Sequence, residues 1–270
     1  MDRIHKTLIA GGPGVGKTVL ALSYCQQPNA GDVLYLDQER GGDYYVVDKP
    51  EQAKPEEFLF HVHRVKAPNL YNIRFLMERL RYPERPGKEL IVCRAPADLN
   101  LLSPEVKSLN NRIAKGELKI GTVVLDTVTR LCEQATRNEL ETRILKHGPK
   151  ADSLNQLTWV AVKDDVSEAL YAMIESGCNV ILTAWAKNAY DKDARASTNE
   201  VIADVLKNVP YFVDLSLLLE PNPRPKGSAT ITPRALVQKS RMRNLPEGAV
   251  VPQATWENIL KFEPRLEEVG

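Results

Sequence analysis

Eight residues near the start of the chain restrict the folds that are open to it. They are Gly11, Gly12, Pro13, Gly14, Val15, Gly16, Lys17 and Thr18. An apolar run, residues 7–10, precedes them, and a helix-like run, residues 19–24, follows. Glycines at this spacing let the backbone curl so that successive amide groups point into one concavity and bind phosphate oxygens at a helix N-terminus. The alternative is an ordinary glycine-rich turn, but all four fixed positions of the P-loop motif are present.

The two side chains that end this motif have separate expected roles. Lys17 is placed to neutralise charge on the β- and γ-phosphates of a nucleotide. Thr18 follows directly, so its hydroxyl can occupy a coordination position of the Mg²⁺ that accompanies the nucleotide. We therefore expect residues 11–18 to bind ATP together with Mg²⁺.

Length and composition limit the remaining possibilities. At 270 residues the chain is long enough for one large α/β core, and we expect a single domain over residues 1–270, with an insertion around 48–118 and a short tail from 245. No apolar run is long enough to span a bilayer and no leader pattern opens the chain, which predicts a cytoplasmic protein without a membrane partner. The net charge of +1 means that nucleic acid would have to bind through a local patch or an assembled ring or filament.

An acidic segment follows the second apolar run. Residues 33–36 have the length and composition of a buried parallel strand, and Asp37 and Glu39 stand at its carboxyl end. In open α/β sheets these ends form the ligand crevice, so both acids are expected beside the P-loop. A solvated loop is the alternative for them.

A third stretch has the form of a Walker B strand. Residues 121–125 are mostly β-branched or apolar and end in Asp126, whose carboxylate would hold the Mg²⁺ shell with Thr18, directly or through water. The next residue is Thr127 rather than a glutamate, so the base that activates water must come from elsewhere. Glu39 is the candidate for that base.

Periodicity and turn residues predict the other elements. Strands are expected over residues 58–65, 89–93, 179–184, 212–219 and 235–239, and helices over residues 70–80 and 157–176, with a further helix beginning after Ser103. No helix separates the last two strands, which indicates an antiparallel edge. Residues 137–152 and 188–208 are polar, and we expect loops there that face a ligand.

With these residues in view, the chain resembles RecA-like ATPases over about residues 5–244, and it is most similar to the phage-type RecA-like or AAA nucleotide-binding proteins of the KaiC and RecA group. The P-loop, the acids after residues 33–36, the segment 123–129 and Lys239-Ser240-Arg241 carry the resemblance. It implies an α/β fold with a mostly parallel, twisted sheet flanked by helices, and Glu39 as the catalytic glutamate.

The resemblance also implies assembly. In the RecA and KaiC-like group a Lys-x-Arg pair on a late strand reaches the nucleotide of the neighbouring subunit, the role implied for Lys239 and Arg241. That role requires a homo-oligomer, a ring or filament with ATP sites at subunit interfaces. A basic strand end in solvent is the alternative. One departure is Trp185, where the family usually has Gln or His as a γ-phosphate sensor; Lys187 is a candidate substitute.

Three functions fit these observations. The first is a Mg²⁺-dependent, DNA-dependent ATPase that acts in phage-type recombination or in handling single-stranded DNA. The second is a KaiC-like regulatory ATPase that works as a switch without DNA. A small-molecule kinase ranks last, because the sequence shows no compact arginine-rich lid.

Overall fold

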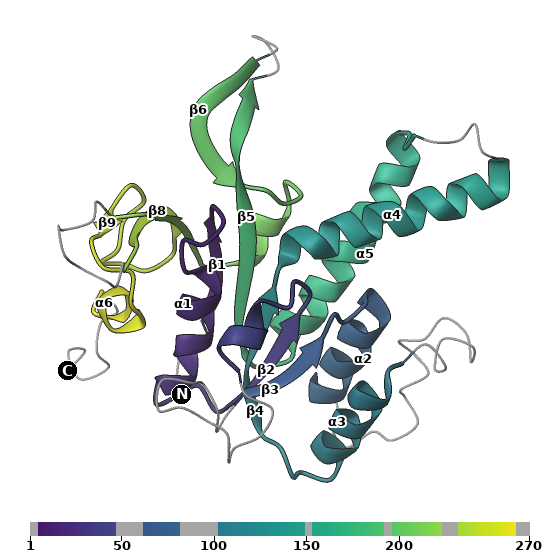
Figure 1. Cartoon of the computed structure of the whole chain (residues 1–270), viewed down its shortest axis with the longest axis horizontal. Helices are drawn as coiled ribbons and strands as arrows, with labels where there is room; N and C mark the ends of the chain where they lie inside the picture. The colour runs from purple at the N-terminus through teal and green to yellow at the C-terminus, as the bar shows by residue number, and fades with distance from the viewer. Residues whose placement is uncertain are drawn as a thin grey trace.

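The structure is a computed structural model that describes residues 5–46, 62–81, 102–148, 153–191, 196–222 and 232–262. Within these ranges nine strands form a connected sheet (Figure 1). They are β1 (Lys6–Gly11), β2 (Asp32–Asp37), β3 (Val62–Lys66), β4 (Ile120–Asp126), β5 (Asn179–Asp191), β6 (Ala196–Ala203), β7 (Leu215–Glu220), β8 (Arg234–Ser240) and β9 (Val250–Val251). Their order is β3-β2-β4-β5-β1-β7-β8-β9, and β6 pairs with β5 outside this path.

The directions of the strands confirm the predicted fold class. All pairings among β1 to β5 and β7 are parallel. Strands β8 and β9 continue the sheet antiparallel from β7, and β6 pairs antiparallel with β5. The sheet is therefore mostly parallel, with antiparallel strands at one edge.

Helices cover both faces of this sheet (Figure 1). They are α1 (Lys17–Ser23), α2 (Leu70–Arg81), α3 (Pro104–Ala114), α4 (Val128–His147), α5 (Gln156–Glu175) and α6 (Trp256–Leu260), with short 3-10 helices η1 (Tyr24–Gln26), η2 (Gly41–Tyr44) and η6 (Val209–Phe212). Helices α2 to α5 pack on one face, and α1 and α6 pack on the other. None of the helices in the described ranges is long and apolar enough to cross a membrane.

Strand β2 illustrates why the core strands are continuous apolar runs. Leu34 and Leu36 pack into the core beneath α2 to α5, whereas Val33 and Tyr35 pack into the core beneath α1. Each of these four side chains is fully buried. A strand with helices on both faces buries every residue, so its sequence does not alternate.

Side-chain caps set where two of the helices begin. The Ser103 hydroxyl accepts a hydrogen bond from the Val106 backbone N–H at 3.2 Å and starts α3, as predicted. The Thr127 hydroxyl accepts from the Arg130 N–H at 3.2 Å, so α4 begins immediately after Asp126. A capped helix satisfies one of its free N–H groups. This cap brings the first turns of α4 to the end of β4.

Two of the predicted loops are wrong. Helix α4 continues to His147 through the first part of the segment expected as a loop, residues 137–152. Strand β5 continues to Asp191 and forms a hairpin with β6, which Figure 1 shows rising away from the rest of the sheet. Pairing satisfies the backbone groups of these polar residues. The strand predicted over 89–93, and the first part of the one predicted over 58–65, lie outside the described residues.

The C-terminal part of the described chain supports the P-loop helix. The Trp256 indole N–H donates to the Leu20 carbonyl of α1 at 2.6 Å, and its ring packs edge-on against Tyr24 at 4.8 Å between centroids. Trp256 is 2% exposed. Trp256 thus packs the N-terminus of α6 against α1 and η1.

Candidate nucleotide-binding site

The P-loop has the backbone shape that its glycines predict. Strand β1 ends at Gly11, and α1 begins at Lys17. Gly14 and Gly16 have φ angles of 69° and 97°, a left-handed conformation that strongly favours glycine. A side chain on Gly11 would come within 2.7 Å of the Val15 methyl carbon. The glycine positions are therefore required by the fold of the loop itself.

Lys17 is held by the loop that it closes. Its ammonium group donates to the carbonyl oxygens of Gly11 at 3.0 Å and Gly12 at 2.8 Å. Burial lowers the pKa of Lys17, while the negative charges of Asp126 and Glu39 act in the opposite direction. Neutral carbonyls are weaker partners for an ammonium group than phosphate oxygens. Lys17 is thus available to phosphates that enter the loop.

Asp126 is the centre of a buried hydroxyl network. It accepts from the Thr18 hydroxyl at 2.7 Å, from the Tyr35 phenol at 2.9 Å and from the Thr183 hydroxyl, which come from α1, β2 and β5. Burial and the Asp126 charge raise the pKa of Tyr35, so the phenol stays protonated. Strand β5 separates β4 from β1, and Thr183 on β5 bridges that interval.

The pair Thr18 and Asp126 fits a magnesium ion that a nucleotide brings with it. Mg²⁺ commonly takes only one or two protein oxygens and completes its shell with water and phosphate. A hydroxyl and a carboxylate 2.7 Å apart supply such oxygens. The described residues contain no cluster of three or more His, Cys, Asp or Glu residues that could hold a metal by itself. A metal here would therefore depend on the bound phosphates.

Asp37 shapes the turn that carries Glu39. Its carboxylate accepts from the backbone N–H groups of Glu39 at 3.2 Å, Gly41 at 3.1 Å and Gly42 at 3.1 Å. Burial raises the pKa of Asp37, and the hydrogen bond from Gly42 opposes that shift. The side chain is fully buried. Asp37 therefore has a structural role in this turn and is shielded from water.

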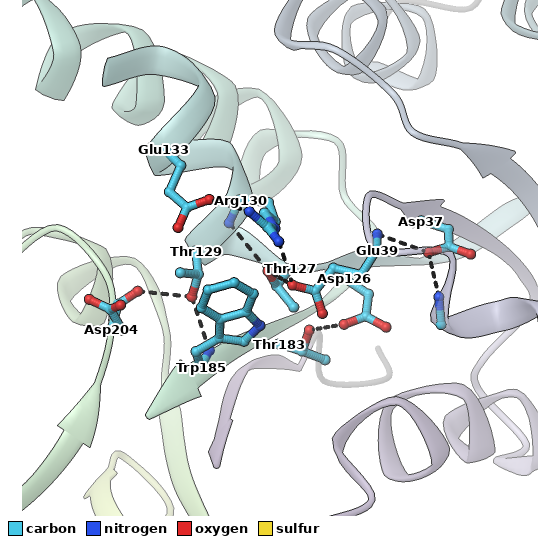
Figure 2. A network of polar contacts seen from close by, with 11 residues as sticks. Asp37, Glu39, Asp126, Thr127, Thr129, Arg130, Glu133, Thr183, Trp185 and Asp204 are labelled. Carbon is cyan, nitrogen blue, oxygen red and sulfur yellow. Dashed lines mark hydrogen bonds and ion pairs between the residues drawn. The ribbon is translucent and has the colours of Figure 1, made fainter. Parts of the chain in front are cut away.

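Glu39 lies at the mouth of the site, with its side chain 25% exposed. Its carboxylate accepts from the Thr127 hydroxyl at 3.4 Å and lies 3.6 Å from the Arg130 Nε (Figure 2). Burial is the larger of two causes that raise the pKa of Glu39, and the charge of Asp126 is the other. The charge of Arg130, a hydrogen bond from Trp185 and the charge of Lys17 lower it. The structure thus places Glu39 on the same side of the sheet edge as Asp126 and Lys17.

The P-loop, its side chains Lys17 and Thr18, and Glu39 line one cleft of about 1120 Å³. The P-loop, with Lys17 and Thr18, forms one part of the cleft wall, and Glu39 forms another part. A face of α4 forms a further part of the wall, and Trp185 from β5 also lines the cleft. The lining residues of α4 are Arg130, Glu133, Gln134, Arg137 and Asn138.

The α4 wall and the hydroxyl donors Tyr35 and Thr183 were not predicted from the sequence. A usable signal was present for the wall. A helix that starts at Thr127 places residues 130, 134 and 137 on one face by their spacing. Residues 137–152 were expected to form a loop, so the face that Arg137 shares with Arg130 and Gln134 was not predicted.

Lys239 and Arg241 lie away from this cleft. The Lys239 ammonium group donates to the carbonyl oxygens of Pro210 at 2.7 Å and Val213 at 2.8 Å, and it lines a second cleft of about 640 Å³. Arg241 is 60% exposed and pairs with Asp214 at 2.9 Å. Strand β8 ends at Ser240, so the expectation that both residues belong to one strand holds for Lys239 alone.

Trp185, which occupies the usual sensor position, and Lys187, the candidate substitute, differ in their placement. Trp185 lines the P-loop cleft, and the Arg130 guanidinium lies 4.5 Å above its ring. Lys187 points elsewhere, into an ion pair with Asp204. Trp185 therefore lines the cleft and contacts Arg130, whereas Lys187 is not among the residues that line the cleft.

The P-loop between β1 and α1, the buried acid at the end of β4 and the sheet order define a RecA-like P-loop nucleotide-binding protein. Residues 4–242 match the AAA_24 family, described as an AAA domain, and the chain belongs to this family. A search of curated proteins finds no match. A solved structure titled "Crystal structure of the RadB recombinase" is similar, with a TM-score of 0.47 and 17% identity over 92% of this chain and 86% of that chain.

Proposed function

We propose that this protein is a Mg²⁺-dependent ATPase whose activity responds to single-stranded DNA, in phage-type recombination or the handling of single strands. One observation carries the proposal. The cleft that brings together Lys17, Thr18 and Glu39 is also lined by Trp185 of β5, the strand that continues into the β5–β6 hairpin.

The P-loop amides and Lys17 bind the phosphates of ATP in this proposal. Thr18 and Asp126 would hold the shell of a magnesium ion, which would supply positive charge against the transferring phosphoryl group. Glu39 accepts a proton from water as the water oxygen bonds to the γ-phosphorus. The bond from that phosphorus to the β,γ-bridging oxygen breaks, and the oxygen keeps the electron pair, which yields ADP and phosphate. Glu39 then returns its proton to solvent.

Hydrogen bonds tie the base of the hairpin to the cleft. The Trp185 backbone N–H donates to the Thr129 hydroxyl at 2.9 Å, and the Asp204 N–H donates to the Trp185 carbonyl at 2.7 Å. The Thr129 hydroxyl in turn donates to the Asp204 carbonyl at 2.9 Å. Thus hydrogen bonds link the first turn of α4, the cleft end of β5 and the residue that follows β6. This supports a route between nucleotide and hairpin.

The hairpin also offers an aromatic platform. Tyr190 on β5 is 61% exposed, and an exposed ring can stack on the bases of a single strand. We expect oligothymidylate to raise the rate of phosphate release from Mg²⁺-ATP. Tyr190→Ala should raise the DNA concentration for half-maximal stimulation on the order of tenfold, because stacking is worth about 1–3 kcal/mol per base.

Tyr211 supplies the matched control for that measurement. It is 77% exposed but lies in η6, outside the hairpin, so Tyr211→Ala should keep the response to DNA. If both substitutions have equal effects, the hairpin is not part of the DNA site. A phosphate-release rate that single-stranded DNA does not change would favour the regulatory ATPase without DNA.

Lys239 and Arg241 are proposed to complete the ATP site of an adjacent subunit. Neither lines the cleft of its own chain, so any action on a nucleotide requires a second copy. A cation delivered in trans stabilises charge on the transferring group and is worth about a thousandfold in rate. Arg241→Ala should therefore lose most ATPase activity, and mixing it with Lys17→Ala should restore activity through hybrid sites.

Arg234 at the other end of β8 provides the control. It is 46% exposed and paired with Glu220 at 2.7 Å, so Arg234→Ala removes a comparable surface ion pair. That variant should keep its activity. Full activity of Arg241→Ala at all protein concentrations, or a strictly monomeric active species, would show that Lys239 and Arg241 belong to a solvated strand end.

A further inference from the structure

Arg130 contacts three parts of the cleft from the first turn of α4. Its Nε lies 3.6 Å from the Glu39 carboxylate, on the turn after β2. Its guanidinium lies 4.5 Å above the ring of Trp185, at the cleft end of the parallel part of β5. Its Nη1 donates to Glu133, on the next turn of α4, at 2.7 Å. Figure 2 shows Arg130 between Glu133 on one side and Glu39 on the other.

This arrangement differs from an ordinary surface ion pair. A helical pair such as Arg130 with Glu133 contributes little stability by itself and needs no aromatic partner. Here the planar guanidinium also lies over the Trp185 ring, a contact that strengthens as solvent is excluded. Arg130 remains 46% exposed and lines the same cleft as Lys17. Its head group is therefore both positioned and accessible from the cleft.

The charges predict what a triphosphate would do to these contacts. Glu39 and Glu133 each offer one negative charge, whereas a terminal phosphate carries more charge and presents oxygens that match the guanidinium fork. Lys17 and Arg130 line the cleft together, so phosphate bound at Lys17 attracts the guanidinium. The contact with Glu39, at 3.6 Å, is long for a charge-assisted hydrogen bond and is the weaker of the two ion pairs.

We propose that Arg130 moves between Glu39 and the γ-phosphate. In the structure it holds the Glu39 carboxylate beside Thr127 and Trp185. When a triphosphate binds, the guanidinium transfers to the terminal phosphate and leaves Trp185, and Glu39 becomes free to accept a proton from water. This inference rests on the ATP hydrolysis proposed above and assigns to Arg130, within the same chain, the response to the γ-phosphate.

Trp185 fluorescence tests the movement without requiring hydrolysis. The measurement uses the full chain with Trp159→Phe, which removes a ring that is 40% exposed and leaves Trp185 and the buried Trp256, whose contribution the Arg130→Gln variant controls for. With Mg²⁺ present, the β,γ-imido analogue of ATP should change the emission of Trp185, and ADP should change it much less. Arg130→Gln should abolish this difference while calorimetry shows that the analogue still binds.

Steady-state kinetics provide the second readout. Arg130→Gln should lower kcat about a hundredfold with little change in KM, because the lost contact acts on the transferring group. Arg130→Lys keeps the charge but loses the planar fork and should recover part of kcat. The control is Arg112→Gln, since Arg112 is also helical, 46% exposed and close to a glutamate, at 4.0 Å from Glu117. It should match the unsubstituted protein in both readouts.

The outcomes separate this inference from the proposed function. Identical emission changes with ADP and the analogue at saturation would overturn the movement of Arg130, as would wild-type kcat in Arg130→Gln. If the protein shows the Arg130-dependent emission change but releases no phosphate from ATP, the movement is supported and ATP hydrolysis is refuted.

Discussion

The Lys17→Ala variant is expected to lose measurable binding of Mg²⁺-ATP. Lys17 donates to the carbonyls of Gly11 and Gly12, and it is the P-loop side chain that carries positive charge into the cleft. Its ammonium group would form charge-assisted hydrogen bonds to the phosphates, each worth about 1.5–3 kcal/mol. Loss of two such bonds weakens affinity by about a hundredfold or more. Calorimetric titration with the β,γ-imido analogue of ATP measures this loss.

A surface lysine on a helix away from the cleft supplies the control. Lys107 lies exposed on α3, so Lys107→Ala removes one positive charge from the chain and should bind the analogue like the unsubstituted protein. Thermal unfolding of both variants checks that the P-loop change leaves the fold intact. Undiminished affinity and hydrolysis in a folded Lys17→Ala variant would remove the basis of the proposed function.

The core of the fold was predictable because its signals are local. A P-loop requires a strand before it and a helix after it, and buried parallel strands are continuous apolar runs. Helix α4 and the β5–β6 hairpin lack such signals in the parts that extend away from the rest of the protein. All buried residues of α4 lie within Val128 to Ala135, so the remainder has no apolar stripe from which a helix could be predicted. The same holds for β5 beyond Ala184, where exposed polar residues pair with β6.

The candidate site likewise contains contacts that short motifs predict and contacts that they do not. Thr18 and Asp126 could be brought together from the sequence, because a P-loop threonine and an acid that ends a parallel strand meet at one sheet edge. The contacts of Glu39 could not be predicted. Thr127 is 88 residues away along the chain, and Arg130 reaches Glu39 only because Thr127 caps α4 directly after β4. Such contacts depend on the packing of several elements and leave no short motif.

The Glu39→Gln variant is expected to bind ATP with nearly unchanged affinity and to hydrolyse it at least about a hundredfold more slowly. Glutamine has the size of glutamate and its amide oxygen can still accept from the Thr127 hydroxyl, which lies 3.4 Å from the carboxylate. It cannot take a proton from water. Single-turnover phosphate release measures the chemical step apart from product release, and Glu141→Gln, an exposed change on α4, serves as the control.

Asp37→Asn tests whether the effect belongs to Glu39 or to the turn that carries it. The Asp37 carboxylate accepts three backbone N–H groups, so its replacement should lower the free energy of unfolding by about 1–3 kcal/mol as well as the rate. Glu39→Gln should leave the unfolding midpoint unchanged. If Glu39→Gln instead turns over at the wild-type rate, Glu39 is not the base. Glu133, the other carboxylate that lines the cleft within the described residues, would then be the side chain to substitute next.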